Sequence, residues 1–308
     1  MTEQTIPHNF VHSIALSPLF QRDQTCFAAQ QSGLYRSVDA GKTWKNMTTD
    51  LSQGVPLAVQ LVAFSPDFEH DHTIYATAHG GVLRSIDGGE TWRTQILTAP
   101  PPFAAALVIS PNYALDGKAF CATVEDGVFC TGDRGGHWAA GNFGLLDLQV
   151  LSLAISPRFS ADEIIIAGTE SGIYRSKNGG RAWRPIDLPC DAGMVTGLAF
   201  ASDARWLFAG TTTGNLLRST DLGATWTVLS QFDDGIDQIT VSPDFEYTGK
   251  VLALSDSTLY ISETAGEGWK VHLDSNDMGE LTCFAIPGGD SSSTYLFAGT
   301  AEKGVIIR

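Results

Sequence analysis

The chain has 308 residues, of which 43% are hydrophobic and 17% charged, and its formal net charge is -15. This composition is globular and excludes a disordered protein. The acidic balance argues against nucleic acid and anionic membranes as partners, because both are bound mainly through Lys and Arg. Residues 1–10 lack the basic start and apolar run of a signal peptide, and no stretch approaches the roughly 20 apolar residues of a membrane span. We therefore expect a cytoplasmic protein.

A unit of 43 to 48 residues recurs along the chain. Its full form, "VAFSPDFEHDHTIYATAHGGVLRSIDGGETW", runs from Val62 to Trp92. Each copy reads as an apolar strand ending at Ser-Pro, a second and a third strand, and a fourth strand that begins at the Trp. Short strands separated by Gly, Pro, Asp and Ser predict four antiparallel strands per repeat, which is one blade of a propeller.

The turn between the third and fourth predicted strands carries the pattern Ser-x-Asp-x-Gly-x-x-Trp. It occurs in full at residues 37–44, 85–92 and 219–226, and with one position changed at residues 131–138, 176–183 and 262–269. The residues in the Asp position are Asp39, Asp87, Asp133, Asn178, Asp221 and Thr264, and the tryptophans are Trp44, Trp92, Trp138, Trp183, Trp226 and Trp269. Side-chain oxygens stabilise tight turns, and the Trp can wedge against a neighbouring blade. We interpret these residues as structural. The alternative, a set of calcium loops, needs six or more oxygens where each turn offers two.

This turn resembles the Asp-box, or BNR, repeat of sialidases, two-domain xyloglucanases, sortilin-type receptors and photosystem II stability/assembly factors, and the resemblance covers essentially the whole chain. It implies a β-propeller whose boxes lie away from the functional sites. After Trp269 the pieces "LTCFAI", "TYLFAGT" and "GVIIR" supply three further strands. We therefore predict an all-β, seven-bladed propeller of four-stranded blades, forming one domain over residues 1–308. Residues 4–10 are expected to complete the last blade and close the ring, which would hide sheet edges.

The connections between blades vary in length and composition, and variable loops on a regular scaffold commonly carry recognition. They lie on the face opposite the boxes and are acidic and partly apolar, which predicts a docking surface for a protein or a basic ligand. The binding candidates are His79, Phe103, Phe143, Leu146, Asp147, Asp191, Asp233, Asp234 and Asp277. The alternative is a solvated loop face with apolar residues tucked over the blades.

A second hypothesis places an enzyme or small-ligand site at the mouth of the central channel. Its catalytic candidates are Asp237, Glu280 and His12, with Gln60 and Gln149 at or near the starts of other inner strands. Asp237 and Glu280 leave a cation site open as an alternative. No metal or cofactor is otherwise expected, since the histidines form no metal motif and the five cysteines have no metal or disulfide spacing.

The resemblance to enzymes is incomplete. Thr5-Ile6-Pro7 stands where sialidases carry Arg-Ile-Pro, and Arg36, Arg84, Arg175 and Arg218 lie beside the boxes. Xyloglucanases place their carboxylates between two propellers, and this chain has one. The favoured function is therefore a non-catalytic scaffold that recruits a protein partner. A glycoside-hydrolase-like or other enzyme is the alternative.

Overall fold

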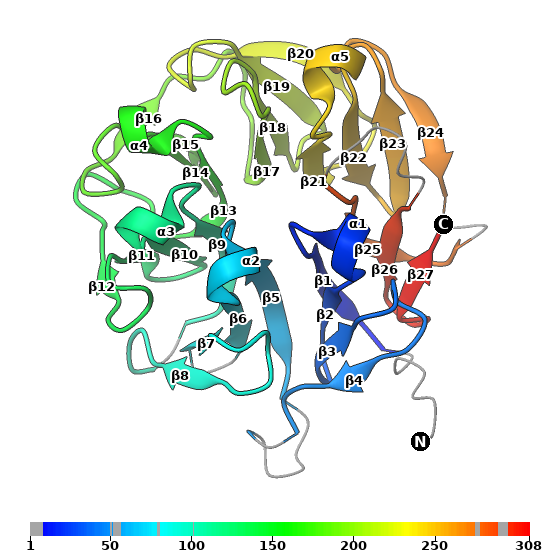
Figure 1. The fold of residues 1–308 in the computed structure, drawn as a ribbon. Helices are drawn as coiled ribbons and strands as arrows, with labels where there is room; N and C mark the ends of the chain where they lie inside the picture. The colour runs from blue at the N-terminus through cyan, green and yellow to red at the C-terminus, as the bar shows by residue number, and fades with distance from the viewer. Residues whose placement is uncertain are drawn as a thin grey trace. The chain divides into compact units, whose positions relative to one another are not determined.

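The strands of the computed structural model form seven antiparallel sheets, and within each sheet the strands are hydrogen-bonded in sequence order. The predicted seven-bladed β-propeller is thus confirmed (Figure 1). The chain divides into two compact units. We call Met1–Ala104 with Ser275–Arg308 the terminal unit and Ala105–Asp274 the central unit, and we treat each by itself. The structure describes residues 9–49, 51, 57–78, 81–100, 102–274, 278–288 and 295–308.

The terminal unit holds the first two blades and the last. Blade 1 comprises β1 (Val11–Leu16), β2 (Cys26–Gln30), β3 (Gly33–Ser37) and β4 (Lys45–Asn46), with α1 (Phe20–Asp23) between β1 and β2. Blade 2 comprises β5 (Val59–Phe64), α2 (Phe68–Asp71), β6 (Ile74–Ala78), β7 (Gly81–Ser85) and β8 (Arg93–Gln95). The last blade has β25 (Leu281–Ala285), β26 (Phe297–Thr300) and β27 (Val305–Ile307).

The central unit holds the remaining four blades. Blade 3 comprises β9 (Ala104–Ile109), α3 (Tyr113–Asp116), β10 (Ala119–Thr123), β11 (Gly127–Thr131) and β12 (Ala139–Ala140), and blade 4 comprises β13 (Val150–Ile155), α4 (Phe159–Asp162), β14 (Ile165–Thr169), β15 (Gly172–Ser176) and β16 (Arg184–Ile186). Blade 5 comprises β17 (Val195–Phe200), β18 (Leu207–Thr211), β19 (Asn215–Ser219) and β20 (Thr227–Gln231). Blade 6 comprises β21 (Ile236–Val241), α5 (Phe245–Thr248), β22 (Val251–Ser255), β23 (Thr258–Ser262) and β24 (Lys270–Leu273).

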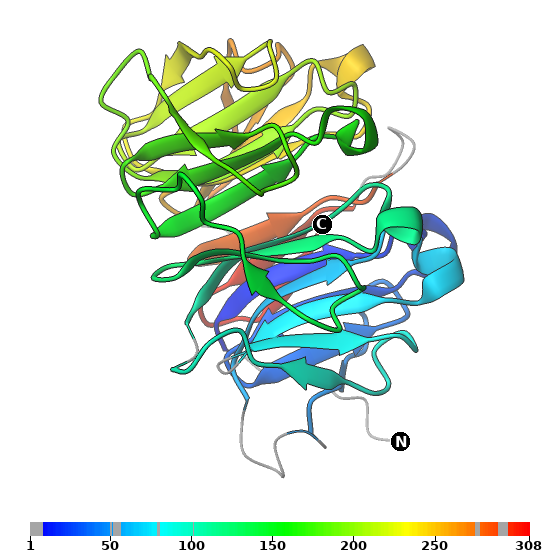
Figure 2. The same cartoon turned by 90° about the vertical axis from the view of Figure 1, so that its left-hand side faces the viewer.

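Burial falls from the second strand of a blade to the fourth. Every residue of β2, β6, β10, β14, β18 and β22 is buried, because both faces of that strand pack against neighbouring side chains. Small, β-branched and aromatic residues suit such a doubly covered strand. The outer strands are short and largely exposed, as β4 and β12 show with two residues each. The strands of each blade lie side by side in Figure 2.

The box turns close through their own side chains. In the second box Ser85 Oγ donates to Asp87 Oδ1 at 2.7 Å and accepts the Gly89 N–H at 2.8 Å. Asp87 also accepts from Thr91 through N (2.9 Å) and Oγ1 (2.6 Å). Both carboxylate oxygens are thus engaged inside the turn. Gly89 has φ +92°, and a Cβ there would come within 2.7 Å of the Phe27 ring, so glycine is required at this position.

A helical turn follows Ser-Pro in five blades, where the sequence pattern predicts only a loop. The helices α1 to α5 each begin with a buried aromatic residue: Phe20, Phe68, Tyr113, Phe159 and Phe245. In four of these blades the Ser hydroxyl donates to an Asp six residues later at 2.7 Å, as from Ser110 to Asp116. This Ser/Asp spacing is visible in the sequence and would have revealed the second recurring turn.

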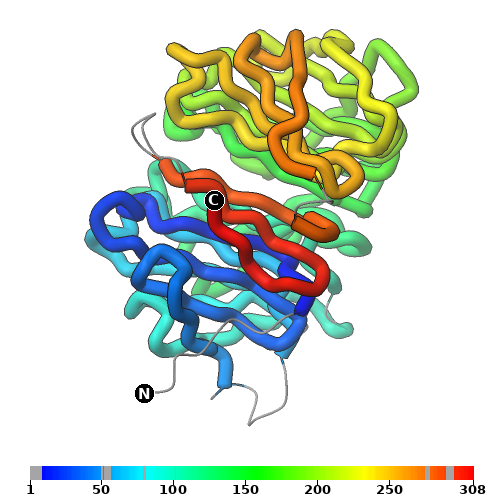
Figure 3. The backbone as a smooth tube through the Cα atoms, turned by 90° about the vertical axis from the view of Figure 1, so that its right-hand side faces the viewer, coloured from blue at the N-terminus to red at the C-terminus, as the bar shows by residue number. Residues whose placement is uncertain are grey.

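The first and last blades pack together within the terminal unit. Thr282 Oγ1 on β25 donates to the Val11 carbonyl on β1 at 2.6 Å, and the Phe20 and Phe297 rings meet edge to face at 5.4 Å. Figure 3 shows the C-terminal strands in red beside the N-terminal strands in blue. The expected closing strand at residues 4–10 lies mostly outside the described residues, and residues 9 and 10 are not in a strand. Closure by residues 4–8 therefore stays a prediction.

Candidate functional site

The start of the inner strand is irregular at one repeated position. In six blades the pairing with the second strand shifts between the first and third residues of the inner strand. β-Bulges of this kind re-aim side chains and are common beside functional sites. The residues left out of register are His12, Gln60, Leu151, Thr196, Asp237 and Thr282. Three of the residues predicted for the channel mouth, His12, Gln60 and Asp237, therefore occupy one equivalent position.

In the terminal unit, His12 lies on β1, which packs against both β5 and β25. Gln60 and Thr282 occupy the equivalent positions on those two strands. His12 is half-buried, and burial lowers its pKa below the ordinary value of an imidazole. Glu280 precedes β25 and is exposed, and its backbone carbonyl accepts the Ala301 N–H at 2.9 Å.

Around the start of β1, several buried polar atoms have no hydrogen-bond partner among the described residues. Gln30 is fully buried, and its Oε1 and Nε2 both lack such a partner, as do Ser13 Oγ and Asn9 Oδ1. Four other blades carry a Thr at the position of Gln30, and its hydroxyl closes the following turn, as from Thr123 to Gly127 O. Sequence reasoning missed Gln30, although its departure from the repeated Thr is visible. Burying an amide without a hydrogen-bond partner costs folding free energy, so such a group is a candidate for contact with a ligand or water.

In the central unit, the titratable residue in this row is Asp237. Burial raises its pKa above 3.8, the Asp256 carboxylate adds to that effect, and a hydrogen bond from the Asp256 backbone opposes it. Asp237 is nevertheless exposed at the surface. The neighbouring bulges hold Leu151 and Thr196, and Thr196 Oγ1 donates to the Ile236 carbonyl. Gln149 lies exposed just before β13.

Among the predicted binding residues of the central unit, Asp147 is hydrogen-bonded within its blade, whereas several others are exposed. Asp147 is held within the blade: it accepts the Ser171 N–H at 2.8 Å and the Gln149 N–H at 3.0 Å. Partial burial works to raise the pKa of Asp147, but hydrogen bonds from the Ser171 side chain and from the Gln149 and Ser171 backbones outweigh it, so the pKa is lowered. Leu146 beside it is 82% exposed, and Asp191, Asp233 and Asp234 are exposed as well.

Phe143 lies next to the fourth box. Its carbonyl accepts the Trp183 N–H at 2.8 Å, which places this residue beside the fourth box and apart from Leu146 and Asp147. The path of the chain after β12 could not be read from the sequence. In the terminal unit Phe103 is 53% exposed. His79 and Asp277 lie outside the described residues.

Neither a cluster of metal-ligating side chains nor a disulfide occurs among the described residues. None of their His, Cys, Asp and Glu side chains form a group of three or more that could hold a metal ion. All five cysteines are unpaired, and burial raises the pKa of Cys26, Cys121 and Cys283 to about 12. No helix in the described part of the chain is long and apolar enough to cross a membrane.

Comparison with known proteins supports the fold alone. No protein-family model and no curated protein matches the chain, so the resemblance to the Asp-box family rests on the turns themselves. Among solved structures, the GH74 xyloglucanase from Xanthomonas campestris is similar at a TM-score of 0.75 and 17% identity, covering 100% of this chain and 53% of that one. YCF48 from Cyanidioschyzon merolae is similar at a TM-score of 0.67 and 16% identity, covering 99% and 96%.

A structure described as YCF48 bound to D1 peptide is similar at a TM-score of 0.72 and 16% identity, covering 99% of this chain and 93% of that one. The chain spans about half or less of the first structures it matches, from 38% to 53%. The single propeller is therefore common to enzymes and to a peptide-bound protein.

Proposed function

We propose that this chain is a non-catalytic binding propeller that recruits a protein partner through the connections between blades. The observation that carries the proposal is the exposure of apolar side chains before the inner strands of blades 4 and 5. Leu146, Leu148 and Met194 expose 82%, 39% and 41% of their surfaces. Their connections end at β13 and β17, which pack against each other. Apolar side chains grouped at one end of neighbouring blades favour a protein interface.

The charge of these connections favours a basic partner surface. Asp191 is exposed in the connection before β17, and Asp233 and Asp234 are exposed in the following connection, which ends at β21. No Lys or Arg occurs in residues 139–157, 185–195 or 228–241 of the sequence. Opposite charge on a partner would speed association and fix its orientation. The similarity to YCF48 bound to D1 peptide supports the proposal only in showing that this fold accommodates a peptide partner.

The test is recovery of a stoichiometric partner from the native host with wild-type protein and two matched variants. Leu146→Asp should abolish recovery, because it places a charge in the apolar contact. Leu115→Asp should leave recovery unchanged, because Leu115 is similarly exposed, at 83%, but belongs to α3. Failure to recover any stoichiometric partner, or equal loss in both variants, would contradict the proposal.

A second candidate function is an enzyme or small-ligand site at the bulged inner-strand residues. Asp237, with its raised pKa and Asp256 acting on it, specifically favours this alternative, because two interacting carboxylates can divide acid and base roles. A thermal-shift screen of divalent cations and oligosaccharides separates the two functions. A shift that is lost in Asp237→Asn and kept in Asp234→Asn would favour the alternative over the scaffold.

A further inference from the structure

Blade 4 carries a pocket of about 410 Å³, a volume within the range of small-ligand sites. It is lined by Arg175, Lys177, Asn178, Ala182 and Arg184. All five belong to β15, the fourth box or β16. The pocket thus gathers three cationic side chains and no carboxylate in a protein whose formal net charge is -15.

Arg175 lacks the carboxylate partner that the equivalent arginine of blade 1 has. In blade 1 the equivalent Arg36 donates to the carbonyl of Gly88 in the next box at 2.9 Å and pairs with Glu90 at 2.5 Å. Arg175 makes the corresponding backbone contact, since its Nε donates to Leu222 O at 2.7 Å. The residue equivalent to Glu90 is Ala224, however. Among the described residues, the two Nη groups of Arg175 have no hydrogen-bond partner.

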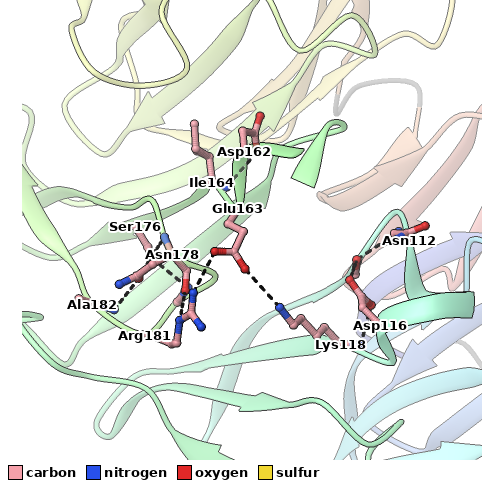
Figure 4. A network of polar contacts seen from close by, with 12 residues as sticks. Asn112, Asp116, Lys118, Asp162, Glu163, Ile164, Ser176, Asn178, Arg181 and Ala182 are labelled. Atoms are coloured by element: carbon pink, nitrogen blue, oxygen red, sulfur yellow. Dashed lines mark hydrogen bonds and ion pairs between the residues drawn. The ribbon is translucent and has the colours of Figure 1, made fainter. Parts of the chain in front are cut away.

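The fourth box also lacks the second carboxylate oxygen that the Asp supplies in other boxes. In three boxes the second carboxylate oxygen of the Asp accepts from a Thr hydroxyl, as Asp221 does from Thr225 at 2.7 Å. Here Asn178 replaces the Asp and Ala182 replaces the Thr. Asn178 Oδ1 accepts from Ala182 N and Ser176 Oγ, both at 2.9 Å, which fixes the orientation of the amide (Figure 4). Its Nδ2 is therefore a donor without a partner in the described structure.

No described carboxylate forms an ion pair with a cationic side chain that lines the pocket. Lys177 and Arg184 are exposed and form no ion pair with any described residue. Glu163 is shared by Arg181 at 2.9 Å and Lys118 at 3.7 Å (Figure 4). Asp162 and Asp221 act on Arg175 electrostatically, but neither lines the pocket or forms an ion pair with Arg175 among the described residues. The lining side chains therefore offer donors from Arg175, Lys177, Asn178 and Arg184.

We propose that this pocket binds the phosphate group of a small molecule. A dianionic phosphate could accept hydrogen bonds from Arg175, as the Glu90 carboxylate does from Arg36. Its oxygens could accept from several donors at once. Guanidinium groups suit this geometry, because their paired N–H groups match phosphate oxygens. An anionic membrane surface is disfavoured by the overall acidity of the chain, which would oppose approach of a large negative surface.

The test is titration of the full chain with inorganic phosphate by isothermal calorimetry, at constant ionic strength set with chloride. We expect saturable binding by the wild type. The double variant Lys177→Gln/Arg184→Gln should weaken binding by about tenfold or more, because it removes two charge-assisted contacts. Both side chains are exposed and unpaired, so folding should be preserved. Arg93→Gln is the matched control, since Arg93 is exposed at the position of Arg184 in blade 2.

A second variant restores the missing carboxylate. Ala224→Glu should place a carboxylate beside Arg175, as Glu90 lies beside Arg36, and should abolish phosphate binding while leaving the apo-protein at least as thermally stable as the wild type. Loss of binding in both pocket variants with retention in Arg93→Gln supports the proposal. Absence of saturable binding by the wild type, or equal binding by all variants, overturns it. Either result is independent of whether a protein partner is recovered.

Discussion

At the scale of single residues, the substitutions in the six boxes are of two kinds. Some preserve the hydrogen bonds of the turn, and one also changes the polar groups around it. Thr131 takes the role of Ser in the third box, donating to Asp133 at 2.8 Å and accepting the Gly135 N–H at 2.9 Å. Thr264 takes the place of the Asp in the sixth box and accepts the Gly268 N–H at 2.8 Å. Asn178 keeps the turn but leaves its Nδ2 without a partner among the residues that the structure describes. The repeat pattern alone makes these substitutions look alike, because it records which residues recur and not where each polar atom points.

The Ser of the box should be a stability determinant. In Ser85→Ala the buried Gly89 N–H loses its acceptor, and we expect a loss of about 1–3 kcal/mol in the free energy of unfolding. Ser85→Thr should cost much less, because Thr131 fills the same role in the third box. Urea denaturation of both variants checks this. Equal destabilisation by Ala and Thr would show that side-chain size, and not the hydrogen bond, matters at this position.

At the scale of elements, the strands were predictable and the irregularities were not. Apolar runs such as residues 74–78 correspond to fully buried strands, and the turns after the third strands were marked by their box residues. The four-residue helices after Ser-Pro are too short to produce a helical hydrophobic period. A bulge at His12 or Asp237 leaves no trace in composition, because it depends on register with the neighbouring strand. The binding roles of the named loop residues stay predictions.

The short helices should anchor their blades through their first residue. Tyr113 at the start of α3 is 1% exposed, whereas Leu115 two residues later is 83% exposed. Tyr113→Ala should lower the free energy of unfolding by about 3 kcal/mol or more, because it removes a buried ring and leaves a cavity. Leu115→Ala should change it by less than about 0.5 kcal/mol. Chemical denaturation of the pair tests this, and similar losses in both variants would contradict an anchoring role for Tyr113.

At the scale of the whole molecule, contacts between distant parts of the sequence hold the terminal unit together. Val11 and Thr282 are separated by 271 positions, yet a hydrogen bond joins their strands. Thr196 makes the equivalent bond from β17 to the Ile236 carbonyl on β21, only 40 positions away. Closing the longer loop costs more chain entropy, so the first and last blades depend on each other. The sequence predicted pairing of the chain ends through a strand at residues 4–10, and that pairing stays a prediction because the segment lies mostly outside the described residues.

The bond from Thr282 should therefore couple the two ends of the chain. Thr282→Val keeps the side-chain shape but removes the donor to the Val11 carbonyl, and we expect a loss of about 1 kcal/mol in stability. Amide hydrogen exchange should accelerate in both β1 and β25, whereas Thr196→Val should accelerate it in β17 and β21. Thr94→Val on exposed β8 is the control. Faster exchange in β25 without any change in β1 would mean that the two strands open independently, because a shared opening event must expose the amides of both.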